Sequence, residues 1–339
     1  MKKAFLFPGQ GAQQVGMGKD LYEALAAARV VFDAAERVTR LPLKKLCFEG
    51  PEEELSRTDI AQPAIFTVSA ALLACLDSLL EPDKVVAMRP AFMAGLSLGE
   101  YTALYAADMI DFADALKLVA GRGSAMQAAA IAVPSGMVIV MGLDEAKANE
   151  LCKAAGNDQV LTCANFNCPG QIVLSGQIDA CKRAVAMAKG FGATVATPLN
   201  VAGAFHCPIM QPAADDLGKA LESVSFRLPR GKAAPDDRGG PALPEWGQAF
   251  AAAGCKVIAN VDGRCYEHLA EVPGKLMAQL TGSTRWQQSM ELLLEQGVTK
   301  FYEIGPGRVL AGLMRRINRK AQIVSVNSRQ GLEELASSL

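Results

Sequence analysis

The chain has 339 residues, of which 50% are hydrophobic and 20% charged, proportions that indicate a globular protein with a large core and exclude a disordered one. Lys and Arg number 34 against 35 Asp and Glu, so the net charge is −1 and a broad nucleic-acid-binding surface is not expected. The nine cysteines form no Cys-x-x-Cys pair and are odd in number. We therefore expect a reducing compartment, with neither a disulfide scaffold nor a zinc site.

The first part of the chain alternates short apolar runs with longer helical patterns. The apolar run that begins the chain is short and ends at Pro8-Gly9, so it predicts a buried strand and not a membrane span. The predicted elements are a strand at 4–7, a helix at 62–80, a strand at 90–95 and a helix at 100–130 with a break near 109–111. Ser97 is therefore expected where a strand passes into a helix.

Between residues 138 and 199 the pattern changes to short strands and helices. The predicted strands are 138–143, 160–164, 172–175 and 194–199, and the predicted helices are 145–155 and 178–189. This order, βαββαβ, is that of a split βαβ or ferredoxin-like unit. We predict an α/β protein in which a larger α/β-hydrolase-like domain with a parallel sheet, at 1–132 and 201–339, contains an inserted ferredoxin-like subdomain at 133–200.

The C-terminal part begins with a segment rich in Pro, Gly and Ala at 229–254. Such a composition predicts an exposed, mobile insertion. Further strands are expected at 256–260 and 301–304, the second being the last clear strand of the chain. A helix at 309–317 follows, with a basic outer face.

The stretch Gly95-Leu96-Ser97-Leu98-Gly99 has the Gly-x-Ser-x-Gly spacing of a nucleophile elbow. A side chain at either glycine would collide with the neighbouring strand or helix. The helix that follows would offer backbone N–H groups to an oxyanion. The spacing alone is short enough to arise by chance, but its place between a strand and a helix favours a nucleophilic serine.

A nucleophilic serine needs a base, and the chain has only two histidines. His206 follows the apolar run "PLNVAGAFH", at the end of a predicted strand. His268 lies in the polar stretch "CYEHLAE", which is typical of a solvated surface. His206 is therefore the better candidate for the base. Histidines and cysteines show no metal-ligand spacing, so we expect no metal.

These motifs resemble those of the malonyl-CoA:acyl carrier protein transacylases, and the resemblance covers nearly the whole chain. Leu96, where the commoner bacterial elbow has His, makes the chain more similar to the plant and cyanobacterial branch. The segment 229–254 departs from the family. The motifs are "FPGQGAQ" at 7–13, "AGLSLGEYTAL" at 94–104, "GRGSAMQ" at 121–127, "ANFNCPGQIVLSG" at 164–176, "AFH" at 204–206, "NVDG" at 260–263 and "EIGPGRVLAGL" at 303–313.

The resemblance implies that malonyl passes from malonyl-CoA to the phosphopantetheine thiol of acyl carrier protein, for type II fatty acid synthesis, through a malonyl-Ser97 ester. His206 would be the general base, oriented by Gln279 in place of a triad carboxylate. The backbone N–H groups of Gln13 and Leu98 would hold the oxyanion. No cofactor is implied, and we expect a soluble monomer of a bacterial cytoplasm or a plastid stroma.

Four residues are expected to contact the acyl group. Arg122 would pair with the free carboxylate of malonate, which suits a planar guanidinium. Met126 would line the pocket, and Asn165 would order the same region. Phe205 would occupy the space that a methyl branch needs, and so favour malonyl over methylmalonyl. More ordinary roles stay open for the four: a surface arginine, helix packing, a turn asparagine and core packing.

Other functions and the face that docks the carrier also stay open. A serine thioesterase would share the elbow but would need a buried acidic residue beside the histidine. The motifs are also compatible with an acyltransferase that loads extender units in polyketide synthesis. The intact Ser97 and His206 argue against a non-catalytic carrier-protein binder. Two basic clusters could dock an acidic carrier: Arg315, Arg316, Arg319 and Lys320, or Lys182, Arg183 and Lys189.

Overall fold

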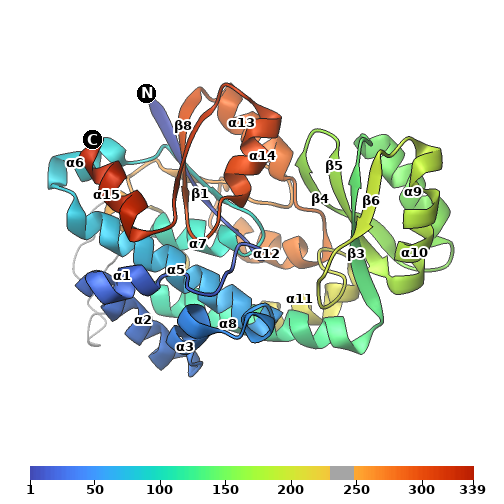
Figure 1. Ribbon diagram of the computed structural model, residues 1–339, viewed down its shortest axis with the longest axis horizontal. Coiled ribbons are helices and arrows are strands. Elements are labelled where there is room, and N and C mark those ends of the chain that lie inside the picture. Colours follow the sequence, from blue (N-terminus) through green and yellow to red (C-terminus); the bar gives the residue numbers. More distant parts are fainter. Residues whose placement is uncertain (230–247) are drawn as a thin grey trace.

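The computed structural model describes residues 1–229 and 248–339 and has two lobes, each built around one sheet (Figure 1). The larger lobe contains a five-stranded parallel sheet in the order β7-β2-β1-β8-β9. This α/β arrangement confirms the predicted fold class and the parallel sheet. The strands are β1 (Lys2–Phe7), β2 (Phe92–Gly95), β7 (Lys256–Val257), β8 (Val298–Ile304) and β9 (Gln322–Val326).

Helices cover the parallel sheet, and α5 (Thr58–Leu79) is the central one. By length and composition α5 could cross a membrane, but 94% of its apolar window is buried inside the molecule, as in the core helix of a soluble protein. The long helix α8 (Phe112–Ala132) packs along it. The other helices of this lobe are α1 (Lys19–Ala24), α2 (Ala26–Thr39), α3 (Leu43–Glu49), α4 (Glu52–Leu55), α6 (Pro82–Met88), α7 (Gly99–Ala106), α11 (Gln211–Leu221), α12 (Glu271–Thr281), α13 (Trp286–Glu295), α14 (Val309–Ile317) and α15 (Arg329–Ser337).

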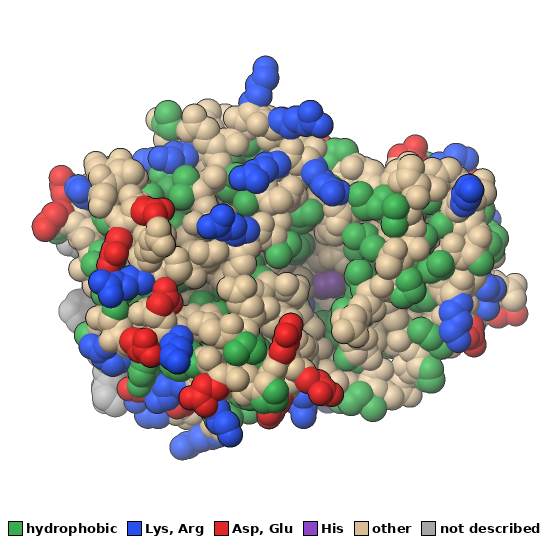
Figure 2. Space-filling view, viewed as in Figure 1, with side chains coloured by type: hydrophobic (Ala, Val, Ile, Leu, Met, Phe, Trp, Pro, Cys, Tyr) green, Lys and Arg blue, Asp and Glu red, His purple; other side chains and the backbone are tan. Residues whose placement is uncertain are grey.

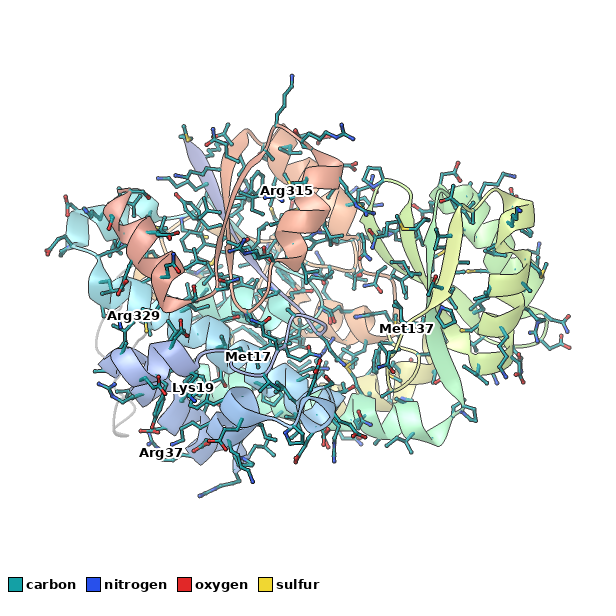
Figure 3. All side chains as sticks on the ribbon, viewed as in Figure 1. Met17, Lys19, Arg37, Met137, Arg315 and Arg329 are labelled. Carbon is teal, nitrogen blue, oxygen red and sulfur yellow. The ribbon has the colours of Figure 1, made fainter. Side chains whose placement is uncertain are left out.

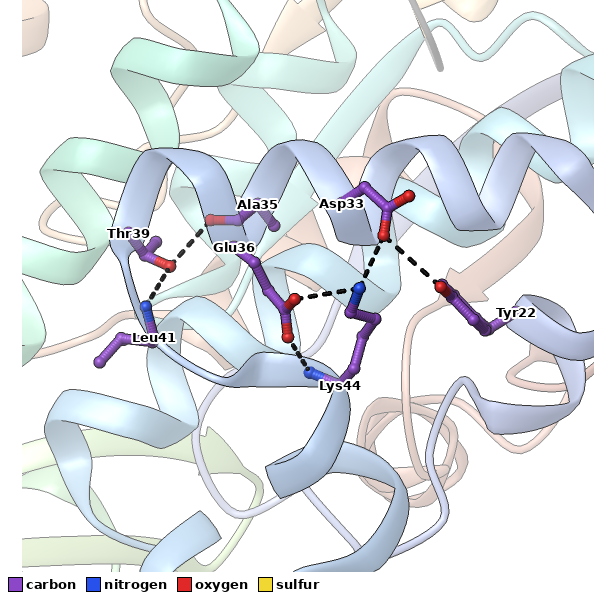
Figure 4. Close-up of polar contacts among 7 residues, drawn as sticks. All are labelled: Tyr22, Asp33, Ala35, Glu36, Thr39, Leu41 and Lys44. Atoms are coloured by element: carbon purple, nitrogen blue, oxygen red, sulfur yellow. Dashed lines mark hydrogen bonds and ion pairs between the residues drawn. The ribbon is translucent and has the colours of Figure 1, made fainter.

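A cluster of polar contacts joins α2 to α3 at the edge of this lobe (Figure 4). Lys44 Nζ lies 2.8 Å from Asp33 and 3.1 Å from Glu36, and these carboxylates raise the pKa of Lys44. The hydroxyl of Tyr22 also donates to Asp33, at 3.5 Å. Because the side chains are partly exposed, these ion pairs contribute little to the free energy of unfolding. Their main effect is to fix the orientation of α2 relative to α3.

The smaller lobe contains a four-stranded antiparallel sheet in the order β4-β5-β3-β6. Its helices lie on the side of the sheet away from the larger lobe (Figure 1) and bury a separate hydrophobic core with it. The Asp144 carboxylate caps the first helix by accepting from Lys147 N at 2.8 Å. The elements, in the predicted order, are β3 (Ser135–Met141), α9 (Glu145–Gly156), β4 (Leu161–Cys168), β5 (Gln171–Gln177), α10 (Ile178–Met187) and β6 (Val195–Pro198).

Three expectations from the sequence need correction. The strand predicted before His206 ends at Pro198, where its pairing with β3 ends. Leu199 N still donates to Met137 O in β3 at 2.9 Å, but residues 199–207 form a loop. The strand predicted at 301–304 is not the last, since β9 follows it at the edge of the sheet. Finally, 230–247 of the predicted insertion lie outside the described residues, but Phe250 is buried, with its ring centroid 5.5 Å from that of Phe5.

The two glycines of the elbow are required by close backbone approach. A Cβ on Gly95 would overlap the backbone of Gly99 at the start of α7, and a Cβ on Gly99 would overlap the carbonyl of Phe7 at the end of β1. Neither neighbour is a flexible side chain that could move aside. The collision expected from the sequence is therefore present at both positions, and it holds the elbow tightly between β1, β2 and α7.

Replacing Gly99 by Ala should lower the free energy of unfolding by about 3 kcal/mol, because backbone must move to admit the methyl group. Gly121→Ala is the matched control: Gly121 is exposed within α8, and a Cβ there meets nothing within 4 Å. That variant should gain about 0.5–1 kcal/mol from helix propensity. Urea unfolding of both variants measures the difference, and equal midpoints would contradict the close approach.

Candidate active site

Ser97 lies between β2 and α7 with a φ of 52°, in the left-handed region that serine rarely adopts. Asn260 holds this turn from both sides. Its Oδ1 accepts a hydrogen bond from Ser97 N at 2.6 Å, and its Nδ2 donates to Gly95 O at 2.6 Å. The strained turn is thus stabilised by a buried side chain that follows β7, and it presents the serine hydroxyl away from the backbone.

The hydroxyl of Ser97 meets His206, whose Nε2 lies 2.8 Å from Ser97 Oγ. The other ring nitrogen, Nδ1, lies 2.7 Å from the backbone carbonyl oxygen of Gln279. A carbonyl only accepts, so Nδ1 carries the proton and Nε2 is free to accept the serine proton. Burial, and then the charge of Arg122, lower the pKa of His206 to about 4. The imidazole is therefore a neutral base at pH 7.

Gln279 contacts the histidine as the resemblance implied, but through its backbone. Its side chain makes other bonds: Oε1 accepts from Arg122 Nη2 at 2.8 Å, and Nε2 donates to Ser97 O at 3.0 Å. No carboxylate within residues 1–229 and 248–339 bonds to either ring nitrogen of His206. Gln279 is therefore hydrogen-bonded to Ser97, His206 and Arg122.

Arg122 is not a surface arginine, since only 1% of it is exposed. Its Nη1 donates to Gln62 Oε1 at 2.6 Å, and its Nη2 donates to Ser97 Oγ at 3.0 Å. Burial lowers the pKa of its guanidinium, and its Nε, also buried, has no hydrogen-bond partner in the structure. A buried cation with an unused donor beside the nucleophile is suited to bind an anionic substrate group.

The backbone donors expected to hold an oxyanion are available. A Cβ on Gly9 would overlap the carbonyl of Leu96, so the loop that carries Gln13 packs directly on the elbow. The side chain of Gln13 folds back, with Oε1 accepting from Gly11 N at 2.7 Å. Within the described ranges, the N–H groups of Gln13 and Leu98 donate to no protein acceptor. They can therefore serve a developing oxyanion.

Of the remaining predicted residues, Met126 and Phe205 are buried near this network and Asn165 is bonded elsewhere. The sulfur of Met126 accepts from Gln62, the residue that holds Arg122, at 3.4 Å. Phe205 precedes His206 and packs in the main core. Asn165 Nδ2 donates to Thr284 at 2.6 Å and so joins β4 to the larger lobe. Its expected place in the acyl site stays a prediction.

Three buried polar residues were not assigned a role from the sequence: Gln62, Glu100 and Asn260. Each is a polar residue among apolar neighbours in the sequence, and a buried polar side chain must find partners. A polar residue inside an apolar stretch of sequence could therefore have marked these three positions as candidates for the site. Glu100 and Asn260 even lie inside two of the motifs that carry the resemblance.

The site opens at the boundary of the two lobes. Figure 2 shows a hollow between them with a histidine side chain inside it. Within the described parts of the chain, no three His, Cys, Asp or Glu side chains group in a way that could hold a metal ion. The cysteines are all free, and eight of the nine are buried. The site itself brings together Ser97, His206 and Arg122.

A half-buried serine in direct contact with a buried histidine, with free backbone donors beside them, defines an acyl-transferring enzyme that uses a serine nucleophile. The family model described as acyl transferase domain matches residues 4–234. The malonyl CoA-acyl carrier protein transacylase of Bacillus subtilis (strain 168) is 38% identical over 333 residues, which cover 98% of this chain and 95% of that protein. The chain belongs to the malonyl CoA-acyl carrier protein transacylase family.

Solved structures agree with this relationship. The malonyl CoA-acyl carrier protein transacylase of Coxiella burnetii has a TM-score of 0.87 and 34% identity, and the match covers 100% of this chain and 98% of that one. A second structure, a type II PKS acyl-carrier protein in complex with its malonyl-transacylase, has a TM-score of 0.86 and 35% identity, with 100% of both chains covered.

The protonation of His206 can be measured directly. Because a backbone carbonyl accepts from Nδ1 and burial lowers the pKa to about 4, the ring should be neutral, with its proton on Nδ1, from pH 8 down to about pH 5. Nitrogen-15 NMR of labelled histidine distinguishes the two ring nitrogens and their protonation. A titration midpoint near 6.5, or a proton on Nε2 at neutral pH, would refute this assignment.

Proposed function

We propose that this protein transfers the malonyl group of malonyl-CoA to the phosphopantetheine thiol of an acyl carrier protein, through a malonyl-Ser97 ester, and so supplies type II fatty acid synthesis. The observation that carries the proposal is the buried guanidinium of Arg122, 3.0 Å from Ser97 Oγ. It places a cation where the free carboxylate of a malonyl thioester would lie when its carbonyl reaches the serine. The family of the chain supports the same reaction.

In the first half-reaction, Ser97 Oγ attacks the thioester carbonyl while His206 Nε2 takes the hydroxyl proton. The carbonyl oxygen becomes an oxyanion, which the N–H groups of Gln13 and Leu98 stabilise. The tetrahedral intermediate collapses, the carbon–sulfur bond breaks, and His206 returns the proton to the coenzyme A thiolate. Malonyl remains on Ser97 as an ester.

In the second half-reaction, the carrier thiol gives its proton to His206 Nε2 and its sulfur attacks the ester carbonyl. The ester bond to Ser97 Oγ breaks, and the serine regains its proton from His206. Proton and acyl group are thus both balanced over the two steps. The neutral state of His206 is required at the start of each half-reaction.

Selection of malonate follows from Arg122 and Phe205. Among the residues that the structure describes, none accepts a hydrogen bond from the buried Nε of Arg122, and an unpaired buried donor is costly until a ligand satisfies it. A carboxylate can accept from Nε and from an Nη group together, which is the side-on bidentate geometry of arginine. The buried ring of Phe205 next to the base leaves little room for a methyl branch, which favours malonyl over methylmalonyl.

Two competing functions are less well supported. A serine thioesterase would need an acidic partner for His206, where this chain offers the carbonyl of Gln279. It would also have no use for a buried arginine at the nucleophile. Supply of malonyl units to polyketide synthesis is a second candidate, because one of the related solved structures contains a type II PKS acyl-carrier protein with its malonyl-transacylase.

We further propose that 133–200 form a ferredoxin-like subdomain set into an α/β-hydrolase-like domain. The antiparallel order β4-β5-β3-β6, with α9 and α10 on one face, supports this description. The bacterial sources of the relatives support the bacterial cytoplasm over the plastid stroma. A monomer remains a prediction.

Of the two basic clusters, we propose the α14 cluster as the carrier-docking face. It consists of Arg315 and Arg316 in the last turn of α14 and of Arg319 and Lys320 just after that helix. Arg183 is committed to α9, donating to Ala155 O at 2.7 Å and Gly156 O at 2.9 Å, and Lys182 pairs with Asp179 at 3.0 Å. The side chains of the α14 cluster are exposed, and within the described residues none pairs with an acid.

The α14 cluster also lies beside the opening of the site, where a docked carrier protein is needed. Figure 2 shows Lys and Arg side chains gathered over β8 and α14, beside the hollow between the lobes, and Figure 3 labels Arg315 on α14. Arg315 and Arg319, together with Lys300, line an open hollow along β9. Arg316 reaches the smaller lobe, where Nη1 donates to Gln171 at 3.1 Å. A carrier docked there could reach the opening of the site.

Incubation with malonyl-CoA alone should add one malonyl group to the protein, at Ser97, and Ser97→Ala should abolish it. Arg122→Ala should slow malonyl transfer by about 30- to 4,000-fold, because it removes a charge-assisted pair with the carboxylate. Acetyl transfer should fall much less or rise. Intact-protein and peptide mass spectrometry with both thioesters measures these rates, and equal losses for the two acyl groups would contradict the role of Arg122.

Charge reversal at the true docking face should raise the KM for carrier protein and weaken its salt dependence, with no change in malonyl-Ser97 formation. We expect this for the double variant Arg315→Glu and Arg319→Glu. The double variant Lys182→Glu and Lys189→Glu on the smaller lobe is the control and should leave the carrier KM unchanged. The opposite ranking of the two variants would place docking on the smaller lobe.

A further inference from the structure

Glu100 is a fully buried carboxylate that the two half-reactions do not use. It lies in the first turn of α7, three residues after Ser97, and 0% of it is exposed. Three donors surround it: the hydroxyl of Tyr266, Gln279 Nε2 at 2.6 Å and Asn260 N at 3.0 Å. Burying a carboxylate costs free energy, and the three donors only partly offset that cost. The presence of this buried charge next to the site therefore needs an explanation.

Two of these donors belong to the residues that hold the reacting groups. Asn260 accepts from Ser97 N at 2.6 Å, so it fixes the strained turn of the nucleophile. Gln279 accepts from His206 Nδ1 with its backbone carbonyl and from Arg122 with its side-chain Oε1. Glu100 is therefore one residue removed from the nucleophile, the base and the arginine at once.

The carboxylate also determines which way the Gln279 amide faces. An ionised carboxylate can only accept, so Gln279 must turn its NH₂ group toward Glu100 and its oxygen toward Arg122. If Glu100 takes up a proton or is replaced by Gln, a new donor on the Oε2 side clashes with the Gln279 NH₂ and the Asn260 N–H, whereas one on the Oε1 side requires the Tyr266 hydroxyl to turn from donor to acceptor. In either case Gln279 and Asn260 lose a charged acceptor, which makes the stronger hydrogen bonds. A flipped amide would relieve that clash but would point NH₂ at Arg122.

We propose that Glu100 is a positioning residue whose carboxylate, by accepting from Gln279 and Asn260, holds Arg122 and Ser97 in the arrangement that accepts malonyl, so that protonation of Glu100 slows acylation. This inference rests on the proposed malonyl transfer and adds to it a residue that never touches the substrate. Tyr266, which follows β7 and donates to the same carboxylate, supports the charged form.

The pKa of Glu100 lies in a pH range in which the enzyme can be assayed. Burial raises the pKa of its carboxyl to about 7, while the bonds from Tyr266, Gln279 and Asn260 and the charge of Arg122 oppose that rise. Among the described residues, the charged and titratable groups that interact with it are Tyr101 on α7, Arg122 on α8 and Tyr266 after β7. Acylation should therefore fall as the pH decreases through about 7. His206, with its pKa near 4, remains neutral over the same range and cannot cause that fall.

The central test compares Glu100→Gln with wild type in the first half-reaction, followed as malonyl-Ser97 formation by rapid-quench mass spectrometry between pH 5.5 and 8.5. The variant should be slower by about 10- to 100-fold at pH 8 and should lose the fall near pH 7. The matched control is Glu303→Gln. Glu303 is equally buried but accepts from Leu310 N, Ala311 N and Ser325 Oγ in the α14 region. The folded control should keep the wild-type rate and pH profile.

Tyr266→Phe gives a second test that does not depend on Glu100→Gln folding. Removing one donor from the carboxylate should shift the midpoint of the pH profile to a higher value, while the rate at pH 8.5 stays within a few-fold of wild type. If Glu100→Gln matches Glu303→Gln in both rate and pH profile, or if Tyr266→Phe leaves the midpoint unchanged, the positioning role is wrong. Failure of wild type to form malonyl-Ser97 would instead overturn the proposed function.

Discussion

Gln279 is the residue on which the geometry of the site depends. Its backbone carbonyl accepts from His206, its side-chain oxygen accepts from Arg122, and its amide nitrogen donates to Ser97 O and to Glu100. The bonds to His206, Arg122 and Glu100 are buried, where a hydrogen bond is electrostatically strong and an unmade one is costly. The base, the cation and the nucleophile can therefore shift only together, through the one turn of α12 that carries this glutamine.

The segment after α12 also attaches the smaller lobe. Thr284 pairs with β4 through Thr284 N to Ala164 O at 2.8 Å and Phe166 N to Thr284 O at 3.0 Å. Arg285 then reaches Glu145 at 2.8 Å and lies 4.5 Å from the ring centroid of Phe166. The joint between the lobes is thus only a few residues from Gln279. Residues 279–285 therefore position His206 and also attach the smaller lobe, which forms one side of the hollow.

Nucleophile and base both lie on strained backbone, with φ values of 52° for Ser97 and 57° for His206. Each such residue costs about 1–3 kcal/mol and persists only when its surroundings determine it. Around Ser97, Asn260 supplies two hydrogen bonds and the elbow glycines allow the close packing. Around His206, the bond to Gln279 supplies the corresponding support. The hydrogen bonds of the network offset the cost of the strained backbone. The strained conformations turn the side chains of Ser97 and His206 toward each other.

The sequence alone determined the local parts of this design. The glycines around Ser97 and the change from an apolar run to helical spacing predicted the elbow, because close backbone packing leaves a direct mark on residue type. The choice of His206 followed from having only two histidines. The βαββαβ order of the smaller lobe was readable because its strands and helices are short, regular and amphipathic.

Only the tertiary structure decided how distant residues meet. The apolar run before His206 looked like a strand, but its pairing with β3 stops where the run begins. Strand β9 was missed because a partly exposed edge strand carries a weak pattern. Every residue has a backbone carbonyl, so no pattern could show that Gln279 holds the histidine through that group. Glu100, Asn260 and Gln279 converge from three separate elements, and a hydrogen-bond network of that kind is a property of their distances in space, which spacing along the chain does not encode.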